Sequence, residues 1–182
     1  MQKGEPIESE KNSPILPLIV EKRKIKKFRK PYFLLGWKES VGLPHLGISQ
    51  IIAKVDSGAR TSVIHAENIN VFKKNRKWMV SFNVKYKIDN MTKSIICQSP
   101  IIDKRKVYDS GGHTENRVFI NTALKIGERV LSADFSLSDR SSMRYSMLLG
   151  RMALCNGYVI VPNKAFLSGI PISLNNYAVE SK

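Results

Sequence analysis

The amino-acid sequence predicts an all-β domain, either a barrel or a sandwich of short strands. Short apolar runs follow one another from residue 33 onward. Turn residues such as Gly, Pro, Asn and Asp separate these runs at intervals of roughly 8–12 residues, a spacing typical of all-β folds. Helical periodicity is weak throughout, except in a short stretch after Gly150, where one helix is expected.

The expected strands coincide with the apolar runs. The run from Trp78 to Tyr86 is the clearest, because apolar and polar residues alternate along it with the period of a half-buried strand. Residues 88–90 are expected to form a hairpin connection after it, and residues 127–128 a later turn. The other expected strands are Phe33–Trp37, Ile48–Val55, Ser94–Ile102, Val118–Ile126, Val130–Leu137 and Tyr158–Val161. Core-facing strand residues are also expected just before Leu148, namely Met143, Tyr145 and Met147.

The chain divides into a basic tail, residues 1–30, and a folded domain, residues 31–182. The tail is expected to be disordered, and residues 21–30 hold seven basic residues in ten. Such a run suits an arm that binds nucleic acid or a ribosome as well as it suits a solubilising tail without a partner. The net charge is +15, and the domain carries +10 of it, 21 basic residues less 11 acidic ones. A basic domain attracts RNA, ribosomes, anionic membranes or acidic peptides, although lysines on a solvated surface also account for such a charge.

The sequence points to a cytoplasmic protein that does not enter a membrane. The two cysteines, Cys97 and Cys155, have no CxxC spacing and are expected to be buried thiols in a reducing compartment. No apolar stretch reaches the roughly 18 residues of a membrane-spanning helix. The apolar segment Pro14–Val20 is short, contains two prolines and follows acidic residues, so it is not interpreted as a signal peptide.

The segment KVDSGART at residues 54–61 places a carboxylate, Asp56, directly after an expected strand. A carboxylate at the end of a buried strand is costly unless it is hydrogen-bonded, and the turn of Ser57 and Gly58 supplies a hydroxyl and open backbone amides beside it. Farther along the chain, the segment MLLGRMAL at residues 147–154 brings an apolar pair up to Gly150. A glycine there allows the close backbone approach that would floor the turn.

These two segments resemble the two halves of a retropepsin, Asp-Ser/Thr-Gly-Ala and then apolar-apolar-Gly-Arg opening a short helix. Together with GWKE at 36–39, KVDSGARTSVIHA at 54–66 and DRSSMRYSMLLGRMAL at 139–154, they resemble one family in particular. Its members are bacterial and archaeal retropepsin-like proteins that accompany ATP-grasp ligases of the type that glutamylates a ribosomal protein. The resemblance covers roughly residues 33–168. It implies a closed acid-protease barrel with one short C-terminal helix, preceded by the basic tail.

The resemblance also implies hydrolysis of a peptide bond by two carboxylates that share one proton. The chain has one Asp-Ser-Gly and no internal repeat, so this chemistry implies a homodimer in which Asp56 of each copy meets the other on a two-fold axis. Ser57 would hydrogen-bond across the floor of the dimer, and Gly58 would leave its amide open to the carboxylate. Asp56, Ser57 and Gly58 are therefore the expected catalytic segment, and the monomer is expected to be inactive.

The family has carried the label of ATP-dependent zinc proteases, and the sequence supports neither group. It contains no GxxxxGK[ST] phosphate loop. His45, His65 and His113 have no ligand spacing and are expected to be unrelated surface histidines, with His65 as an ordinary strand or loop residue. We therefore expect no metal and no cofactor.

The position after Ala59 departs from the retropepsin pattern. Typical retropepsins carry an acidic residue there, which pairs with the arginine of the apolar-Gly-Arg segment, whereas this chain has Arg60 to face Arg151. Because an arginine fork binds carboxylates in bidentate fashion, both arginines, with Thr61 beside them, are candidates for binding an acidic substrate. The alternative is that the two arginines pair with Glu39 or Asp139 and never touch substrate.

Residues 103–117 occupy the interval that holds the flap in a retropepsin. The run is polar, and Gly111 with Gly112 lies at its centre, where paired glycines give a tip the freedom to close over a ligand. The basic residues of this run would line the flap with positive charge: Lys104, Arg105, Lys106 and Arg117. The alternative is a hairpin loop without a role in substrate binding.

The favoured function is a homodimeric aspartic peptidase that cuts acidic peptides. By the resemblance, the substrate is the glutamate tail that a partner ATP-grasp ligase adds to a ribosomal protein. The main alternative is a non-catalytic module of the same fold that binds polyglutamate, the ligase or the ribosome. A β domain that binds RNA is the weakest reading, because base-stacking aromatic motifs are missing and lysines give only non-specific affinity for nucleic acid.

Overall fold

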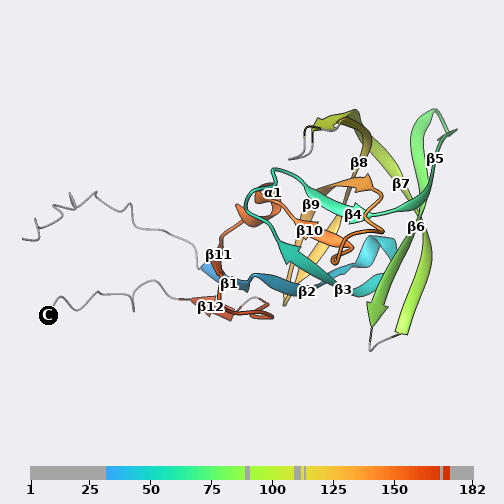
Figure 1. The fold of residues 1–182 in the computed structure, drawn as a ribbon. Helices are drawn as coiled ribbons and strands as arrows, with labels where there is room; N and C mark the ends of the chain where they lie inside the picture. The colour runs from blue at the N-terminus through green and yellow to red at the C-terminus, as the bar shows by residue number, and fades with distance from the viewer. Residues whose placement is uncertain (1–31, 89–90, 109–111, 113, 169, 173–182) are drawn as a thin grey trace, which may run out of the picture.

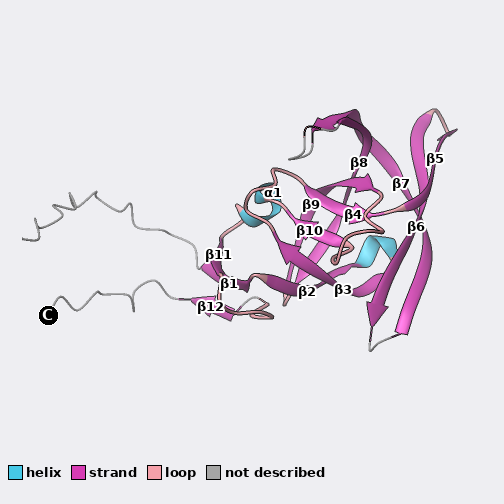
Figure 2. Ribbon diagram, in the orientation of Figure 1, coloured by secondary structure: helices cyan, strands magenta, loops and turns pink. Residues whose placement is uncertain are grey.

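The computed structural model describes residues 32–88, 91–108, 112, 114–168 and 170–172. The expected tail of residues 1–30, the segment Pro14–Val20, the turn residues 89–90, Gly111 and His113 lie outside the described residues. So does the end of the chain, residues 173–182. Within the described part, the chain forms strands with two short helical segments, η1 (Pro44–Leu46) and α1 (Arg151–Leu154), as Figure 2 shows. None of the described helices has the length and apolar character that crossing a membrane requires.

The centre of the fold is a closed barrel. Its strands follow the order β2-β3-β10-β4-β9-β8, and a further pairing of β2 with β8 closes the ring. This confirms the expected acid-protease type of barrel with one short helix near its C-terminal end (Figure 1). The barrel strands are β2 (Lys38–Leu43), β3 (Ile48–Val55), β4 (Ser62–His65), β8 (Thr114–Ile126), β9 (Arg129–Ser138) and β10 (Met147–Leu149).

The same sheet continues beyond β8 into a long antiparallel extension. Its order is β8-β7-β6-β5, with β5 (Glu67–Lys74), β6 (Lys77–Ile88) and β7 (Met91–Tyr108). Figure 1 shows these strands on one side of the barrel. On the opposite side lies a small separate sheet of order β11-β1-β12, from β1 (Tyr32–Gly36), β11 (Tyr158–Val161) and β12 (Ile170–Ile172).

The hydrophobic core fills the barrel and extends beneath β6 and β7. Strand β3 contributes Ile48, Ile51, Ala53 and Val55, which are all buried, and β6 contributes Phe82, which is fully buried. Alternation of buried and exposed residues along these strands therefore has the physical cause that the sequence suggested: one face of each strand packs inward. The expected strands Ile48–Val55 and Tyr158–Val161 have the predicted bounds.

Several local expectations are wrong. Met143 is 57% exposed, and neither it nor Tyr145 belongs to a strand, whereas Met147 is fully buried at the start of β10. Polar residues 139–142 form a turn there, so the chain enters the core only at Met147. Cys97 is buried, as expected, but Cys155 lies exposed after α1.

Candidate active site

The crossing of β3, β10 and β4 positions Asp56. Strand β10 lies between the other two, parallel to β3 and antiparallel to β4. The connection from β3 to β4, residues 56–61, must therefore pass over the end of β10. The Asp56 amide donates to the Leu149 carbonyl at 2.9 Å, and the amide of Arg151 donates to the Ala59 carbonyl at 2.9 Å. Two segments that are far apart in the sequence thus form one hydrogen-bonded unit.

The carboxylate of Asp56 is held by its own turn. Oδ1 accepts hydrogen bonds from the amide of Gly58 at 3.0 Å and from the amide of Ala59 at 3.2 Å. The side chain is half-buried, and Ser57 and Gly58 are exposed beside it. Two backbone donors stabilise the charged form of a carboxylate and fix its direction. The arrangement presents an oriented acid at the surface of the barrel, as the Ser-Gly turn predicted.

Gly150 lies against the backbone of the turn. A Cβ atom at this position would lie 2.5 Å from the carbonyl carbon and 2.7 Å from the carbonyl oxygen of Thr61. The Gly150 amide also donates to the buried hydroxyl of Ser62 at 3.1 Å. Only glycine fits this approach, because the backbone atoms it faces cannot rotate away. This supports the expectation that Gly150 floors the turn.

The side chain of Arg151 holds the turn by hydrogen bonds to its carbonyl groups. Its Nη1 donates to the carbonyl oxygens of Ser57 at 2.9 Å and Gly58 at 2.8 Å. The expected alternative, in which Arg60 and Arg151 pair with Glu39 or Asp139, does not occur. The Asp139 carboxylate accepts from the amide of Ser141 at 2.8 Å and lies 3.5 Å from His65. The Ser141 bond lowers the pKa of Asp139.

Glu39 is fully buried and bonds to a different part of the chain. Its Oε1 accepts from the amides of Gly36 at 2.5 Å and Leu167 at 2.9 Å. Its Oε2 accepts from the amide of Ser168 at 2.9 Å and from the Ser168 hydroxyl at 2.5 Å. Four donors replace the water that the charge loses on burial. The role of Glu39 is thus structural: it ties β2 to the segment before β12.

A cavity of about 1010 Å³ opens in front of Asp56. Asp56 is the one carboxylate among the described residues that line it. Basic side chains dominate the rest of the lining: Arg60, Arg105, Lys106, Arg117 and Arg140. Apolar surface in the same lining comes from residues that include Val63, Phe119 and Leu148. We call this the catalytic cavity, because Asp56 is the expected catalytic residue.

The arms of the expected flap form one wall of the catalytic cavity. They are the paired ends of β7 and β8, in register from Tyr108 with Thr114 to Arg105 with Arg117. Gly112 has φ +81°, which an L side chain rarely adopts, and a Cβ there would meet nothing within 4 Å. These observations fit a hairpin tip near the cavity. Lys104 is exposed and does not line the cavity, unlike the other basic residues expected in the flap.

Two flap arginines are held by neighbouring carboxylates. Arg105 lies 2.6 Å from Asp103, and its guanidinium stacks over the ring of Phe119 at 4.0 Å. Arg117 donates from Nε to Glu115 at 2.7 Å. Each of these pairs engages one edge of the guanidinium, and an arginine has five N–H donors. Among the residues that the structure describes, both guanidiniums therefore keep N–H donors without a hydrogen-bond partner.

Arg140 was not predicted as a site residue. Its Nε donates to the Tyr145 carbonyl at 3.2 Å, and its amide donates to Nδ1 of His65 at 2.9 Å. Burial lowers the pKa of Arg140, and the charge of Arg117 lowers it further, whereas the charge of Asp56 raises it. Arg140 is therefore a half-buried cation within electrostatic reach of the Asp56 carboxylate. The segment DRSSMR carried this information, but no ligand pattern separated Arg140 from the other basic residues.

Two of the three histidines, His45 and His65, lie in the described part of the chain. The described residues contain no group of three or more His, Cys, Asp or Glu side chains arranged to hold an ion. The expectation that the histidines lie at the surface is wrong for His65, which is 5% exposed at the end of β4. Its imidazole accepts the amide of Arg140 and lies 3.4 Å from Glu67, so it fixes the loop after β9.

A solved structure shares this fold. The crystal structure of Lpg0085 from Legionella pneumophila, a protein of unknown function, superposes with a TM-score of 0.60 and covers 74% of this chain and 96% of that chain. The sequence identity is 23%, so the likeness concerns the fold alone.

Curated relatives share the sequence over most of this chain. A protein named probable alpha-L-glutamate ligase from Shewanella pealeana is 40% identical over 138 residues, which are 75% of this chain and 30% of the relative. A protein of the same name from Desulfotalea psychrophila is 43% identical over 130 residues, 71% of this chain and 28% of the relative. The chain thus spans less than a third of the length of these relatives.

The family comparison covers the whole barrel and the turn that carries Asp56. Residues 34–169 match the RimB-like family, described as the retropepsin-like aspartic endopeptidase RimB. The matched range includes the Asp-Ser-Gly turn, Gly150 and Arg151, which the structure brings together. The chain therefore belongs to the RimB-like family of retropepsin-like aspartic endopeptidases.

Proposed function

We propose that this chain is one subunit of a homodimeric aspartic peptidase that cuts acidic peptides. The observation that carries the proposal is the catalytic cavity, in which one oriented carboxylate, Asp56, faces five basic side chains. Hydrolysis with carboxylates needs two of them, since one must be ionised and the other protonated. A second copy of the chain is the natural source of the second carboxylate.

In the proposed reaction, the ionised carboxylate takes a proton from water as the water oxygen attacks the scissile carbonyl carbon. The protonated carboxyl group donates to the carbonyl oxygen. The carboxyl group that took the water proton then gives it to the leaving nitrogen as the C–N bond breaks, and the other carboxylate takes a proton back from a hydroxyl of the tetrahedral intermediate. The amides of Gly58 and Ala59 orient Asp56, Ser57 is proposed to hydrogen-bond across the dimer floor, and Arg151 holds the carbonyl groups of this turn in place.

The substrate class follows from the lining charges. Arg60, with Thr61 beside it, and the flap residues Lys106 and Arg117 present donors for substrate carboxylates. Arg151 and the glycines of the flap tip, Gly111 and Gly112, complete the proposed substrate-binding set. A tail of glutamates, such as a ligase adds to a ribosomal protein, meets these requirements.

The proposed partner is an alpha-L-glutamate ligase. Relatives with that name contain a region similar to this chain within a longer protein. In our proposal, the peptidase removes the glutamates that a ligase of this kind adds. We propose that this chain acts on the product of such a ligase.

The decisive experiment is a mass-spectrometric cleavage assay. The protein and its Asp56→Asn variant are each incubated with a peptide that carries an oligoglutamate tail, and with an oligolysine peptide as a control. Loss of glutamates with the parent protein alone supports the hydrolase. No cleavage of any peptide between pH 4 and pH 8 contradicts it.

The second candidate is a binding module of the same fold that does not cut. It is favoured by the five basic side chains of the catalytic cavity, which bind acidic peptides whether or not Asp56 has a catalytic partner. Equal affinity of the parent protein and the Asp56→Asn variant for an uncut oligoglutamate tail would identify this function.

A further inference from the structure

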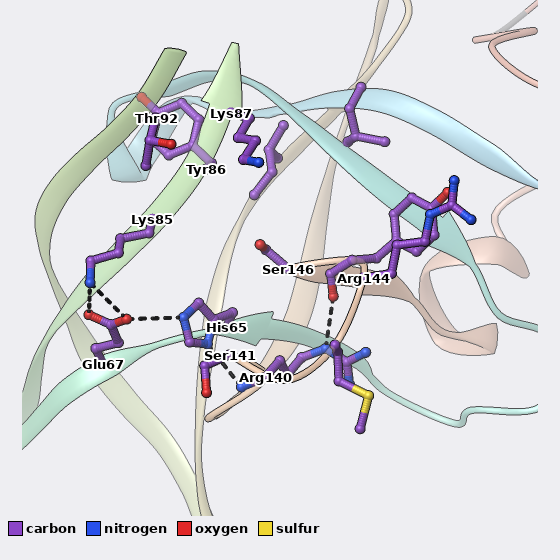
Figure 3. A pocket seen from close by; sticks show the side chains of 14 residues that line it. His65, Glu67, Lys85, Tyr86, Lys87, Thr92, Arg140, Ser141, Arg144 and Ser146 are labelled. Carbon is purple, nitrogen blue, oxygen red and sulfur yellow. Dashed lines mark hydrogen bonds and ion pairs between the residues drawn. The ribbon is translucent and has the colours of Figure 1, made fainter. Parts of the chain in front are cut away.

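A second cavity of about 520 Å³ lies beside the loop that follows β9 (Figure 3). Its walls come from β3, from the end of β4, from the far end of the β6–β7 hairpin and from residues 140–146. Arg140 lines both this second cavity and the catalytic cavity. The two cavities are therefore neighbours along the surface. Arg140 is the described residue that the two linings have in common.

Positive charge dominates the second cavity. Its lining includes the acidic, basic and histidine residues His65, Glu67, Lys85, Lys87, Arg140 and Arg144. Glu67, the one carboxylate among the described lining residues, is already engaged. Lys85 Nζ lies 2.8 Å from its Oε2, His65 Nε2 lies 3.4 Å from its Oε1, and these contacts lower the pKa of Glu67 (Figure 3).

Two cations of the second cavity lack a carboxylate partner. Among the described residues, neither Lys87 nor Arg144 has a carboxylate within ion-pair distance, and both are exposed. The guanidinium of Arg144 lies over the ring of Tyr145 at 5.6 Å. In Figure 3, Lys87 lies farther along β6 than Lys85, which is bonded to Glu67, and Arg144 lies on the loop that follows β9. The cavity thus offers two positive groups to a ligand that brings its own negative charge.

The backbone beside these cations is open as well. Strand β5 pairs with β6 from Lys74 with Lys77 to Glu67 with Asn83. Beyond that point, β6 pairs with β7 alone among the described strands, up to Ile88 with Met91. An extended peptide can add to such a free strand edge. Lys85 and Lys87 project from one face of this stretch, two residues apart, which matches alternate side chains of an added strand.

We propose that the second cavity is a carboxylate-binding subsite for the part of an acidic peptide that lies away from the scissile bond. Lys87 and Arg144 receive the carboxylates, and the free edge of β6 receives the extended backbone. The proposal rests on the proposed function, because it names a further site for the same acidic substrate. It explains how the protein favours a run of acidic residues over a single one.

The test compares short and long peptides. Fluorescently labelled diglutamate and octaglutamate peptides are titrated against the full chain with Asp56→Asn, so that no cleavage interferes, and KM is measured for both peptides with the parent protein. The longer peptide is expected to bind more tightly. In a Lys87→Ala/Arg144→Ala variant this gain with length is expected to shrink about tenfold, since each exposed ion pair contributes about threefold in affinity.

The matched control is a Lys74→Ala/Lys77→Ala variant. It removes the same charge from the opposite end of the β5–β6 hairpin and should retain the full gain with length. An equal loss in both double variants would show a general effect of net charge and overturn the proposal. An unchanged gain in affinity with peptide length in the Lys87→Ala/Arg144→Ala variant, at an unchanged melting temperature, would also overturn the proposal. If the parent protein cuts neither peptide, the proposed function fails, and the binding titration still decides whether this subsite exists.

Discussion

At the scale of single residues, two carboxylates of this chain lie in contrasting environments. Asp56 is half-buried, and its Oδ1 accepts two amides from its own turn, while the side chain still faces an open cavity. Glu39 is fully buried, and both of its oxygens are occupied by donors from residues 36, 167 and 168. A carboxylate whose acceptors are all satisfied inside the protein contributes to stability. One that faces a cavity is available for chemistry.

Glu39→Gln is expected to destabilise the protein. The substitution turns one acceptor oxygen into an NH₂ group that faces amide and hydroxyl donors, so the free energy of unfolding should fall by about 3 kcal/mol. Denaturant titration at neutral pH measures this change. Glu128→Gln, an exposed residue in the turn before β9, is the control and should change stability by less than about 0.5 kcal/mol. Equal stability of the two variants would contradict the structural role of Glu39.

At the scale of elements, the site depends on the contact between the 56–61 turn and the end of β10. Gly150 occupies the space in which a side chain would meet the backbone of Thr61. The Asp56 amide donates a hydrogen bond to the carbonyl oxygen of Leu149, the last residue of β10. The position of the Asp56 carboxylate is therefore set by β10, which lies more than 90 residues later in the chain.

Gly150→Ala and Gly58→Ala are expected to have different effects: the first lowers stability, and the second lowers activity without lowering stability. The new Cβ of Gly150→Ala lies 2.5 Å from backbone, so the turn must move, and stability should fall by about 1–3 kcal/mol or more. The new Cβ of Gly58→Ala lies 3.2 Å from Oδ1 of Asp56, a side-chain atom that can shift by a few tenths of an ångström. That variant should keep its stability and lose activity. Thermal unfolding and the cleavage assay separate the two effects, and equal losses of stability would contradict this account.

At the scale of the whole molecule, charge and stoichiometry decide what the barrel can do. The chain carries a net charge of +15, and the described residues that line its catalytic cavity include five basic residues and one carboxylate. Long-range attraction therefore favours acidic partners, and it weakens as salt is added. The single carboxylate underlies the proposal that the active species is a dimer.

Mixing experiments test the proposed dimer. When a fixed amount of parent protein is mixed with an equal amount of Asp56→Asn and the subunits reassort, activity is expected to fall to about half, because random pairing places half of the parent subunits in mixed dimers. Sedimentation velocity at the assay concentration gives the oligomeric state. Undiminished activity after complete exchange would show that one Asp56 suffices. The same run compares the sedimentation coefficient of the Asp56→Asn variant with that of the parent protein. A variant whose coefficient differs is not used in the mixing experiment.

Much of the fold followed from local patterns. The alternation from Trp78 to Tyr86 lies within β6, and the apolar run Ile48–Val55 is β3 with the same bounds. Short strands such as β4 and β10 carry no periodic signal of their own, because all or most of their residues are buried on both faces. Met143 was misplaced for a related reason. An apolar residue beside a strand is not distinguishable by composition from one within it.

The sequence by itself determined the chemistry of the Asp-Ser-Gly turn, the basic character of the domain and the pairing of residues 54–61 with 147–154. Each depends on residue types and their order along the chain. Only the tertiary structure decided that Glu39 is a buried structural residue and that Arg151 holds the turn by hydrogen bonds. It alone placed Arg140 between two cavities. The reason is physical: an ionisable side chain takes its role from the donors, charges and water around it, and folding brings those neighbours from distant parts of the chain.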